Sequence, residues 1–100
     1  MIIYNVTVNI NHDAHDAWLL WMKQEHIPHV MNTGMFVESR MLRLIGDEDS
    51  GGTTYAIQYT CATMADYERY KTEFAPALIK EAGDKFKDKF VAFRSLLETV

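Results

Sequence analysis

The sequence predicts an α+β domain with the element order β-α-β-β-α-β, the ferredoxin-like split βαβ arrangement. Three observations predict this fold. Residues 2–10 alternate between two faces, as in a half-buried strand. A polar loop at 47–52 separates two further strand patterns, as in a hairpin. Two apolar helical segments share the motif E-x-x-P followed by x and Val or Leu, at Glu25 to Val30 and Glu73 to Leu78, which indicates two related halves.

The first half begins with a strand over residues 2–10 and continues into a helix over 13–25, with Asn11 or Asp13 as its N-cap. The middle of this helix, from Ala17 to Met22, is apolar on all sides and contains two tryptophans. A helix on a two-layer domain needs only one apolar stripe, so a second contact surface is expected there. Pro28 deprives the helix of an amide, which predicts a kink or break at residue 27 and a short turn ending near residue 33.

Residues 35–45 form the expected second strand, with a bulge possible, and residues 53–61 form the third. The acidic loop between them lacks the ligand spacing of a calcium loop. Thr63 to Asp66 has the form of a capping box for a second helix, whose aromatic stripe of Tyr67, Tyr70 and Phe74 is expected in the core. Pro76 interrupts this helix as Pro28 does the first, and Gly83 is the expected C-terminal cap.

Residues 90–100 are expected to form the last strand, with Val91 and Phe93 inward and Arg94 on the opposite face. Right-handed crossovers place both helices on one face of the antiparallel sheet. The other face then has no cover within the chain. Its expected members are Asn5, Thr7, Asn9, Gln58, Thr60 and Arg94, mixed with Ile3, Ala56 and Ala92. Two copies packed face to face would cover such a surface, and the sequence therefore predicts a homodimer.

Length and composition indicate one domain spanning residues 1–100. The chain is 48% hydrophobic, which is sufficient for a core. The net charge of −4 argues against a nucleic-acid or membrane partner, because both surfaces attract clustered Lys and Arg. Tyr55 and Tyr59 stand where RNA-binding domains of this topology carry stacking aromatics, but the basic-Gly-aromatic signature is absent. The single cysteine, Cys61, cannot form an internal disulfide, and a cytoplasmic protein is expected.

The chain also carries a family resemblance. It rests on the opening MIIYNVTVNI, the stretch from Trp18 to Pro28, the Gly-Gly-Thr-Thr-Tyr segment and the ending from Lys89 to Arg94. These segments resemble a family of bacterial proteins of this length known only as a domain of unknown function. Its layout is similar to the dimeric α+β barrel superfamily, which includes cofactor-free monooxygenases, isomerases and haem-handling proteins. The resemblance implies a homodimer with a cavity, but no particular chemistry.

His26 is the candidate catalytic residue. It follows Trp18 and Met22 at helical spacing, so it is expected to face inward, with a hydrogen-bond partner and a disfavoured charged form. A core histidine without catalytic function is the competing interpretation. The candidate ligand-binding residues are Trp21, Asn5, Thr7, Arg40, Tyr59 and Arg94. His12-x-x-His15 and His26-x-x-His29 have the spacing of metal ligands, but nothing completes a set, and neither a metal nor a cofactor is expected.

Two functional classes fit these features. The first is a dimer that either binds a small molecule or acts on it as a cofactor-free enzyme, with His26 as acid or base. The second is a non-catalytic module for dimerisation or protein interaction. No phosphate loop, nucleophile elbow or carboxylate pair favours a particular reaction. A cavity lined by polar side chains would favour the first class, and a cavity filled by a partner the second.

Overall fold

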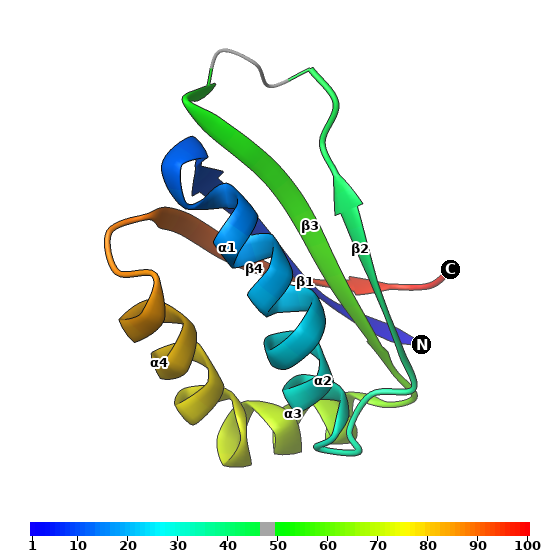
Figure 1. Ribbon diagram of the computed structural model, residues 1–100. Helices are drawn as coiled ribbons and strands as arrows, with labels where there is room; N and C mark the ends of the chain where they lie inside the picture. The colour runs from blue at the N-terminus through cyan, green and yellow to red at the C-terminus, as the bar shows by residue number, and fades with distance from the viewer. Residues whose placement is uncertain (47–49) are drawn as a thin grey trace.

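The fold is a four-stranded antiparallel sheet with a helical layer on one face, as seen in a computed structural model that describes residues 1–46 and 50–100 (Figure 1). The strand order is β2-β3-β1-β4. The central strands are β1 (Ile2–Asn11) and β3 (Gly52–Cys61), and the edges are β2 (Glu38–Arg43) and β4 (Phe90–Glu98). All three neighbouring pairs are antiparallel. The predicted ferredoxin-like βαββαβ fold is confirmed.

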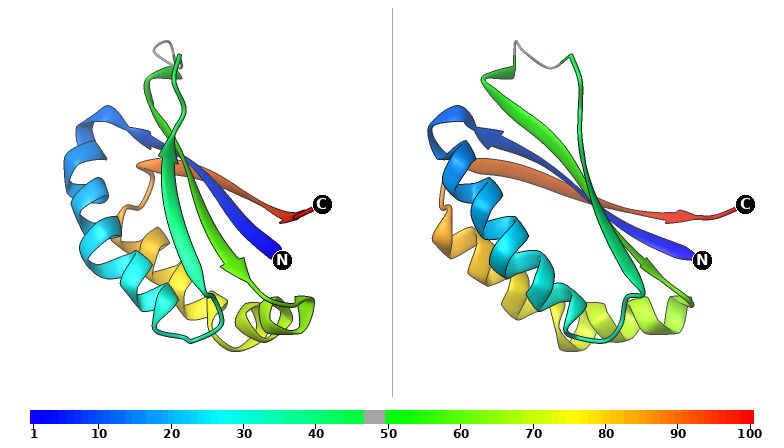
Figure 2. Two further views of the ribbon diagram at one scale, coloured as in Figure 1. Left: turned by 90° about the vertical axis from the view of Figure 1, so that its right-hand side faces the viewer. Right: turned by 45° about the vertical axis from the view of Figure 1, so that its right-hand side comes forward.

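Two helical crossovers cover one face of the sheet and leave the other open (Figure 2). The first contains η1 (His12–Ala14), α1 (His15–Trp21), the π-helical turn η2 (Met22–His26) and α2 (Ile27–Met31). The second contains α3 (Met64–Glu73) and α4 (Ala75–Lys85). No helix in the described part of the chain is long and apolar enough to cross a membrane.

The two prolines occupy equivalent places, as the repeated motif predicts. α2 and α4 each begin one residue before a proline, Pro28 or Pro76. At the first site the chain widens into the π-helical turn, in which the amide of Ile27 bonds to the carbonyl of Met22. The helix keeps its direction, so the kink or break predicted at residue 27 is wrong: the widened turn accommodates Pro28 instead. At the second site Phe74 leaves helical geometry, with φ −120°, and α4 turns away from α3 (Figure 1). The cause in both is a residue that cannot donate a backbone hydrogen bond.

The helix ends agree only in part with the expected caps. The Thr63 side chain accepts a hydrogen bond from the Asp66 amide at 3.2 Å, as a capping box requires. Asn11 stands at the N-cap of η1 but makes no side-chain cap hydrogen bond, and Asp13 pairs with Lys89 instead. Gly83 was expected to end its helix, which is wrong: α4 continues through it to Lys85.

The hydrophobic core lies between the helices and the sheet. Aromatic rings fill one end of it, where Tyr4, Phe36, Tyr59 and Tyr70 contact one another with ring centroids 4.7 to 6.2 Å apart. Trp18 and Trp21 are buried at the other end. β2 is shorter than expected, since it starts at Glu38, and Phe36 reaches this core from the segment before the strand. Of the expected hairpin loop 47–52, residues 47–49 lie outside the described part of the chain.

The predicted orientation of the last strand is wrong. Directly opposed residues of antiparallel strands point to the same face. Val6 is opposite Arg94 and Val8 is opposite Ala92, so Arg94 and Ala92 face the helices. Val91 and Phe93 lie on the open face, where 72% and 65% of their surfaces are exposed. Apolar residues occur in both phases of β4, and pairing with β1 decides which phase faces the core.

The open face of the sheet combines a polar centre with an apolar edge. Asn5 donates to Thr7 Oγ1 and Ser95 Oγ and accepts from Gln58, which in turn accepts from Arg40 Nε at 2.8 Å. The apolar part consists of Val91, Phe93 and Leu97 on β4 and Leu42 on β2, all of them exposed. The polar groups at the centre thus satisfy one another, and the apolar edge is left without a cover inside the chain.

Candidate functional site

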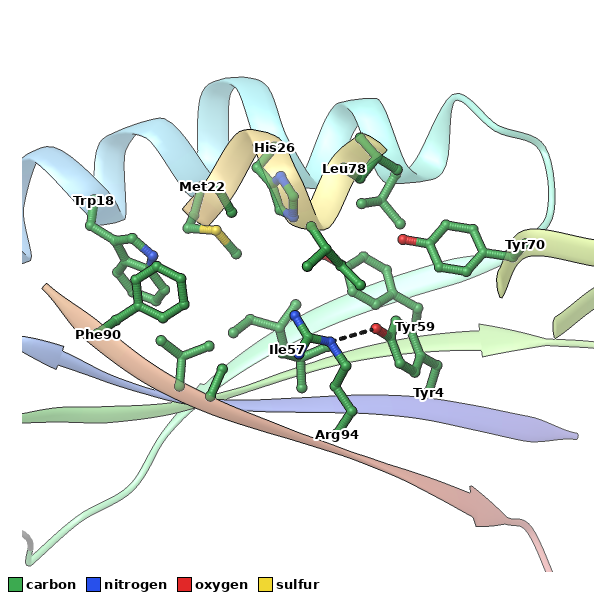
Figure 3. A pocket seen from close by; sticks show the side chains of 16 residues that line it. Tyr4, Trp18, Met22, His26, Ile57, Tyr59, Tyr70, Leu78, Phe90 and Arg94 are labelled. Atoms are coloured by element: carbon green, nitrogen blue, oxygen red, sulfur yellow. Dashed lines mark hydrogen bonds between the residues drawn. The ribbon is translucent and has the colours of Figure 1, made fainter. Parts of the chain in front are cut away.

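A cavity lies between the helical layer and the sheet, and both layers contribute to its wall (Figure 3). Its volume is about 50 Å³, and we call it the inner cavity. Most of the wall is aliphatic or aromatic. The polar groups are a histidine from η2, three tyrosines from β1, β3 and α3, and an arginine from β4: His26, Tyr4, Tyr59, Tyr70 and Arg94.

His26 points from the last residue of η2 toward the sheet (Figure 3). Trp18, Met22 and His26 all line the inner cavity, as their spacing predicts, so the inward orientation is confirmed. The imidazole stacks on Trp21, with ring centroids 4.8 Å apart. Trp21, which does not line the cavity, thereby helps to fix the plane of the His26 imidazole.

The His26 imidazole lacks the hydrogen bond that buried polar groups usually make. Its Nδ1 is enclosed and has no partner within residues 1–46 and 50–100, which corrects the expectation that this ring is tied to a carbonyl. Burial lowers the pKa of His26, and the positive charge of Arg94 and the neighbouring His29 act in the same direction, while Glu81 opposes them. The ring is therefore a neutral base near physiological pH, as predicted.

Three tyrosine hydroxyls share this wall. Burial raises the pKa of Tyr4, Tyr59 and Tyr70, and for Tyr59 and Tyr70 the neighbouring tyrosines add to the effect. The phenols therefore stay protonated and are available as hydrogen-bond donors. Tyr70 enters from the α3 end of the cavity, with its hydroxyl toward the centre (Figure 3).

Arg94 places a cation at the edge of the cavity. It comes from the edge strand β4, and its Nε donates to the Tyr4 hydroxyl at 3.1 Å (Figure 3). A guanidinium carries five N–H donors, and this bond uses one of them. Arg94 is the one residue of the described cavity wall with a permanent charge, and no carboxylate lines the inner cavity.

A second cavity adjoins the first. Its volume is about 140 Å³, and we call it the outer cavity. The two share Tyr4, Tyr70, Ile79 and Arg94. The outer cavity adds Tyr67, Ala75 and Lys71, and its exposed lining is largely apolar and again contains no carboxylate. Arg94 therefore stands where the two cavities meet.

The structure divides the seven candidate site residues between the two faces of the sheet. His26, Tyr59 and Arg94 line the inner cavity, and Trp21 supports His26 without lining it. Asn5, Thr7 and Arg40 lie on the open face with their side chains hydrogen-bonded to neighbours on that face. The sequence analysis missed Tyr4 and Tyr70 as cavity residues. Both could have been found, because each is a tyrosine with a polar hydroxyl at a position expected in the core: Tyr4 on β1 and Tyr70 in the aromatic stripe of α3.

Neither histidine pair forms a metal centre with its surroundings. No group of three or more His, Cys, Asp or Glu side chains is positioned to hold a metal ion among the residues that the structure describes. His15 bonds to the Tyr55 hydroxyl at 2.7 Å and to Asp16 at 2.8 Å, and His29 lies 3.7 Å from Glu81. Each of these contacts is a local polar pair.

The order of strands and helices is that of ferredoxin-like proteins. The chain is similar over its full length to the crystal structure of HapK from Hahella chejuensis, with a TM-score of 0.73, 10% identity and 93% of that chain covered. It is also similar to a dimeric ferredoxin-like protein from an uncultured marine organism, with a TM-score of 0.60, 15% identity, and 99% of this chain and 96% of the other covered. A third neighbour is SnoaB, a cofactor-independent oxygenase from Streptomyces nogalater, with a TM-score of 0.65, 13% identity, and 98% and 92% covered.

The chain itself belongs to a family described as a domain of unknown function, DUF4286, which matches residues 1–100. The family resemblance noted in the sequence is thereby confirmed. No curated protein of known function matches the chain. At identities of 10 to 15%, the structural neighbours establish the fold and not the reaction.

Proposed function

We propose that the inner cavity binds a small molecule and that His26 takes a proton from it, without a cofactor. The observation that carries the proposal is that His26 presents a neutral, unpartnered imidazole to the same cavity as Arg94. A histidine that served packing alone would have its nitrogens satisfied. The similarity to a cofactor-independent oxygenase supports the idea that this fold hosts chemistry without a bound cofactor.

The proposed step is general base catalysis. Because Nδ1 is enclosed, Nε2 is the nitrogen that a ligand can reach. Nε2 accepts a proton from a carbon or oxygen acid of the ligand, and the electron pair of the broken bond stays on the ligand. Arg94 and the tyrosine hydroxyls stabilise the resulting negative charge, which grows only as the proton leaves. The proton then returns from the imidazolium to the product or passes to water.

Binding is tested by NMR with benzoate and benzamide, two probes of the same shape. We expect at least one to shift the side-chain signals of His26 and Trp18, which line the cavity, more than those of His12, which is exposed. If neither probe shifts them at millimolar concentration, the proposal of a ligand cavity is wrong.

Proton transfer is tested by deuterium exchange. Phenylacetone and phenylpyruvate carry acidic C–H groups, and the protein is expected to accelerate their exchange in D₂O over the buffer rate. His26→Phe should abolish the acceleration while the protein remains folded. Acceleration that survives in this variant would remove His26 as the base. A protein that binds the probes and accelerates neither exchange would be a binding protein.

We further propose that the open face of the sheet forms a two-fold homodimer. Exposed Phe93, Val91 and Leu97 give this face an apolar edge, and the neighbouring proteins include ones described as dimeric. In such a dimer Asn5, Thr7 and Arg40 belong to the interface and not to the ligand site. The exposed apolar edge also favours the second candidate function, a non-catalytic dimerisation module. The deuterium-exchange experiment distinguishes this module from an enzyme.

The buried free thiol of Cys61 supports a reducing, cytoplasmic location.

A further inference from the structure

We infer that the ligand of this site is a small organic anion, a carboxylate joined to an apolar body about the size of one ring. The inference rests on the proposed function, because it names the class of molecule that the same cavity takes. The carboxylate would lie in the inner cavity beside Arg94, and the apolar body would fill the outer cavity. Charge, donor geometry and volume each support this assignment.

The charge of the two cavities is opposite to that of the whole protein. The chain has a net charge of −4, with 14 acidic and 10 basic residues. Even so, the charged side chains that line the inner and outer cavities are Arg94 and Lys71, and no Asp or Glu lines either one in the described part of the chain. Both side chains are exposed to solvent, so water screens part of their charge, but no carboxylate among the described residues of either lining competes with a ligand for them. The site therefore selects negative charge.

The free donors are arranged for an acidic group. Arg94 uses Nε for the Tyr4 hydroxyl, which leaves the terminal N–H groups of its guanidinium for a ligand. The Tyr59 and Tyr70 hydroxyls make no hydrogen bond to the described part of the chain and line the same wall. A carboxylate only accepts hydrogen bonds and can accept several, whereas a neutral amide presents donors of its own to a wall rich in donors.

The volumes fix the size and the orientation of the ligand. The outer cavity, about 140 Å³, is close to the roughly 150 Å³ at which an apolar protein cavity holds a benzene ring. The inner cavity, about 50 Å³, has room for a few polar atoms but not for a second ring. Because the outer wall is largely apolar and the inner one carries Arg94, His26 and the tyrosines, the ring belongs outside and the carboxylate inside.

The test compares benzoate with benzamide, which differ in charge and hardly in shape. We expect the wild-type protein to bind benzoate at least about tenfold more tightly, measured by NMR titration or by the change in total tryptophan fluorescence. Arg94→Gln should remove this preference and change benzamide binding less than about threefold, and Arg94→Lys should retain part of it. The matched control is Arg40→Gln, which removes an arginine that pairs with glutamine on the open face and should change neither affinity.

The outcomes separate this inference from the proposed function. Equal affinity for the two probes in the wild type overturns the anion inference and leaves the ligand cavity standing. Binding of neither probe overturns the cavity itself. Benzoate binding that is unchanged in Arg94→Gln overturns the inference, since the anion then lies elsewhere. Thermal unfolding of each variant verifies that loss of the Tyr4 hydrogen bond has not unfolded the protein. If Arg94→Gln is unfolded, the affinities of Arg94→Lys for benzoate and benzamide are compared with those of the wild type instead.

Discussion

Replacing His26 with phenylalanine is expected to stabilise the protein while abolishing its ligand binding. The enclosed Nδ1 of His26 has no partner in the described part of the chain. A buried polar atom left without a hydrogen bond costs about 1 to 3 kcal/mol. Phenylalanine removes this atom and retains an aromatic ring against Trp21, which lies 4.8 Å away between centroids.

The net effect is smaller than the full cost of the unpaired atom. A phenyl ring is larger than an imidazole, and forcing extra atoms into a packed core costs about 1 to 3 kcal/mol. Here the ring borders the inner cavity of about 50 Å³, which takes up much of the extra volume. We therefore expect a gain of about 1 kcal/mol in the free energy of unfolding. For a domain of this size, that corresponds to a rise of roughly 4 to 8 °C in Tm.

The assay is urea and thermal unfolding of the wild type and the variant, followed by titration with the two probes. His29→Phe is the matched control, because His29 lies one turn away on the same crossover, is exposed and pairs loosely with Glu81. Surface changes of this kind stay within about 0.5 kcal/mol. If His26→Phe instead loses more than about 1 kcal/mol, the imidazole has a hydrogen-bond partner in solution, and the argument from an unpaired base is wrong.

Three further predictions concern assembly, pH and glycine. Phe93→Ser should shift sedimentation from dimer to monomer, whereas Leu20→Ser, a change at another exposed apolar residue on α1, should not; a wild-type monomer at micromolar concentration would refute the dimer. Because the pKa of His26 is lowered in the folded state, His26 binds more protons in the unfolded state, and wild-type stability should fall relative to His26→Phe below about pH 6.5. A difference in the free energy of unfolding between the two proteins that stays constant down to about pH 5 would contradict this. Gly52→Ala should lower the free energy of unfolding by about 1 to 3 kcal/mol, because its Cβ would lie 2.4 Å from the Ile10 carbonyl oxygen. Gly83→Ala should raise it by up to about 1 kcal/mol, because Gly83 lies within α4, and equal unfolding midpoints of the two variants would refute this contrast.

The sequence predicted those parts of the fold that local chemistry determines. Strict alternation in β1 fixes which side chains face the helices, and the missing amides of Pro28 and Pro76 fix where the helices change. The inward orientation of His26 followed from its spacing to Trp18 and Met22, because helical periodicity survives one widened turn. These features depend on neighbours within a few residues.

The orientation of β4 could not be predicted in the same way. The strand reads FVAFRSLLE, with apolar residues in both phases, so burial of either face is compatible with its composition. The pairing of Val6 with Arg94 decides the matter, and this contact joins two strands at opposite ends of the chain. The expectation that an arginine faces away from the core then chose the wrong phase. For the same reason the inner cavity could not be predicted, because Arg94 contacts Tyr4 there only when Arg94 faces the helices.

Two unusual polar groups of the helix-covered face meet in one place. The enclosed imidazole nitrogen of His26 without a partner reduces stability relative to an apolar residue of similar size, and Arg94, which is exposed to solvent, is turned toward the same helical layer. Proteins accept such local conflicts mainly at functional sites. Since His26 and Arg94 both line the inner cavity, between three protonated tyrosines and an apolar space of ring size, a ligand that meets Nε2 of His26 and the guanidinium of Arg94 explains why these two residues lie together.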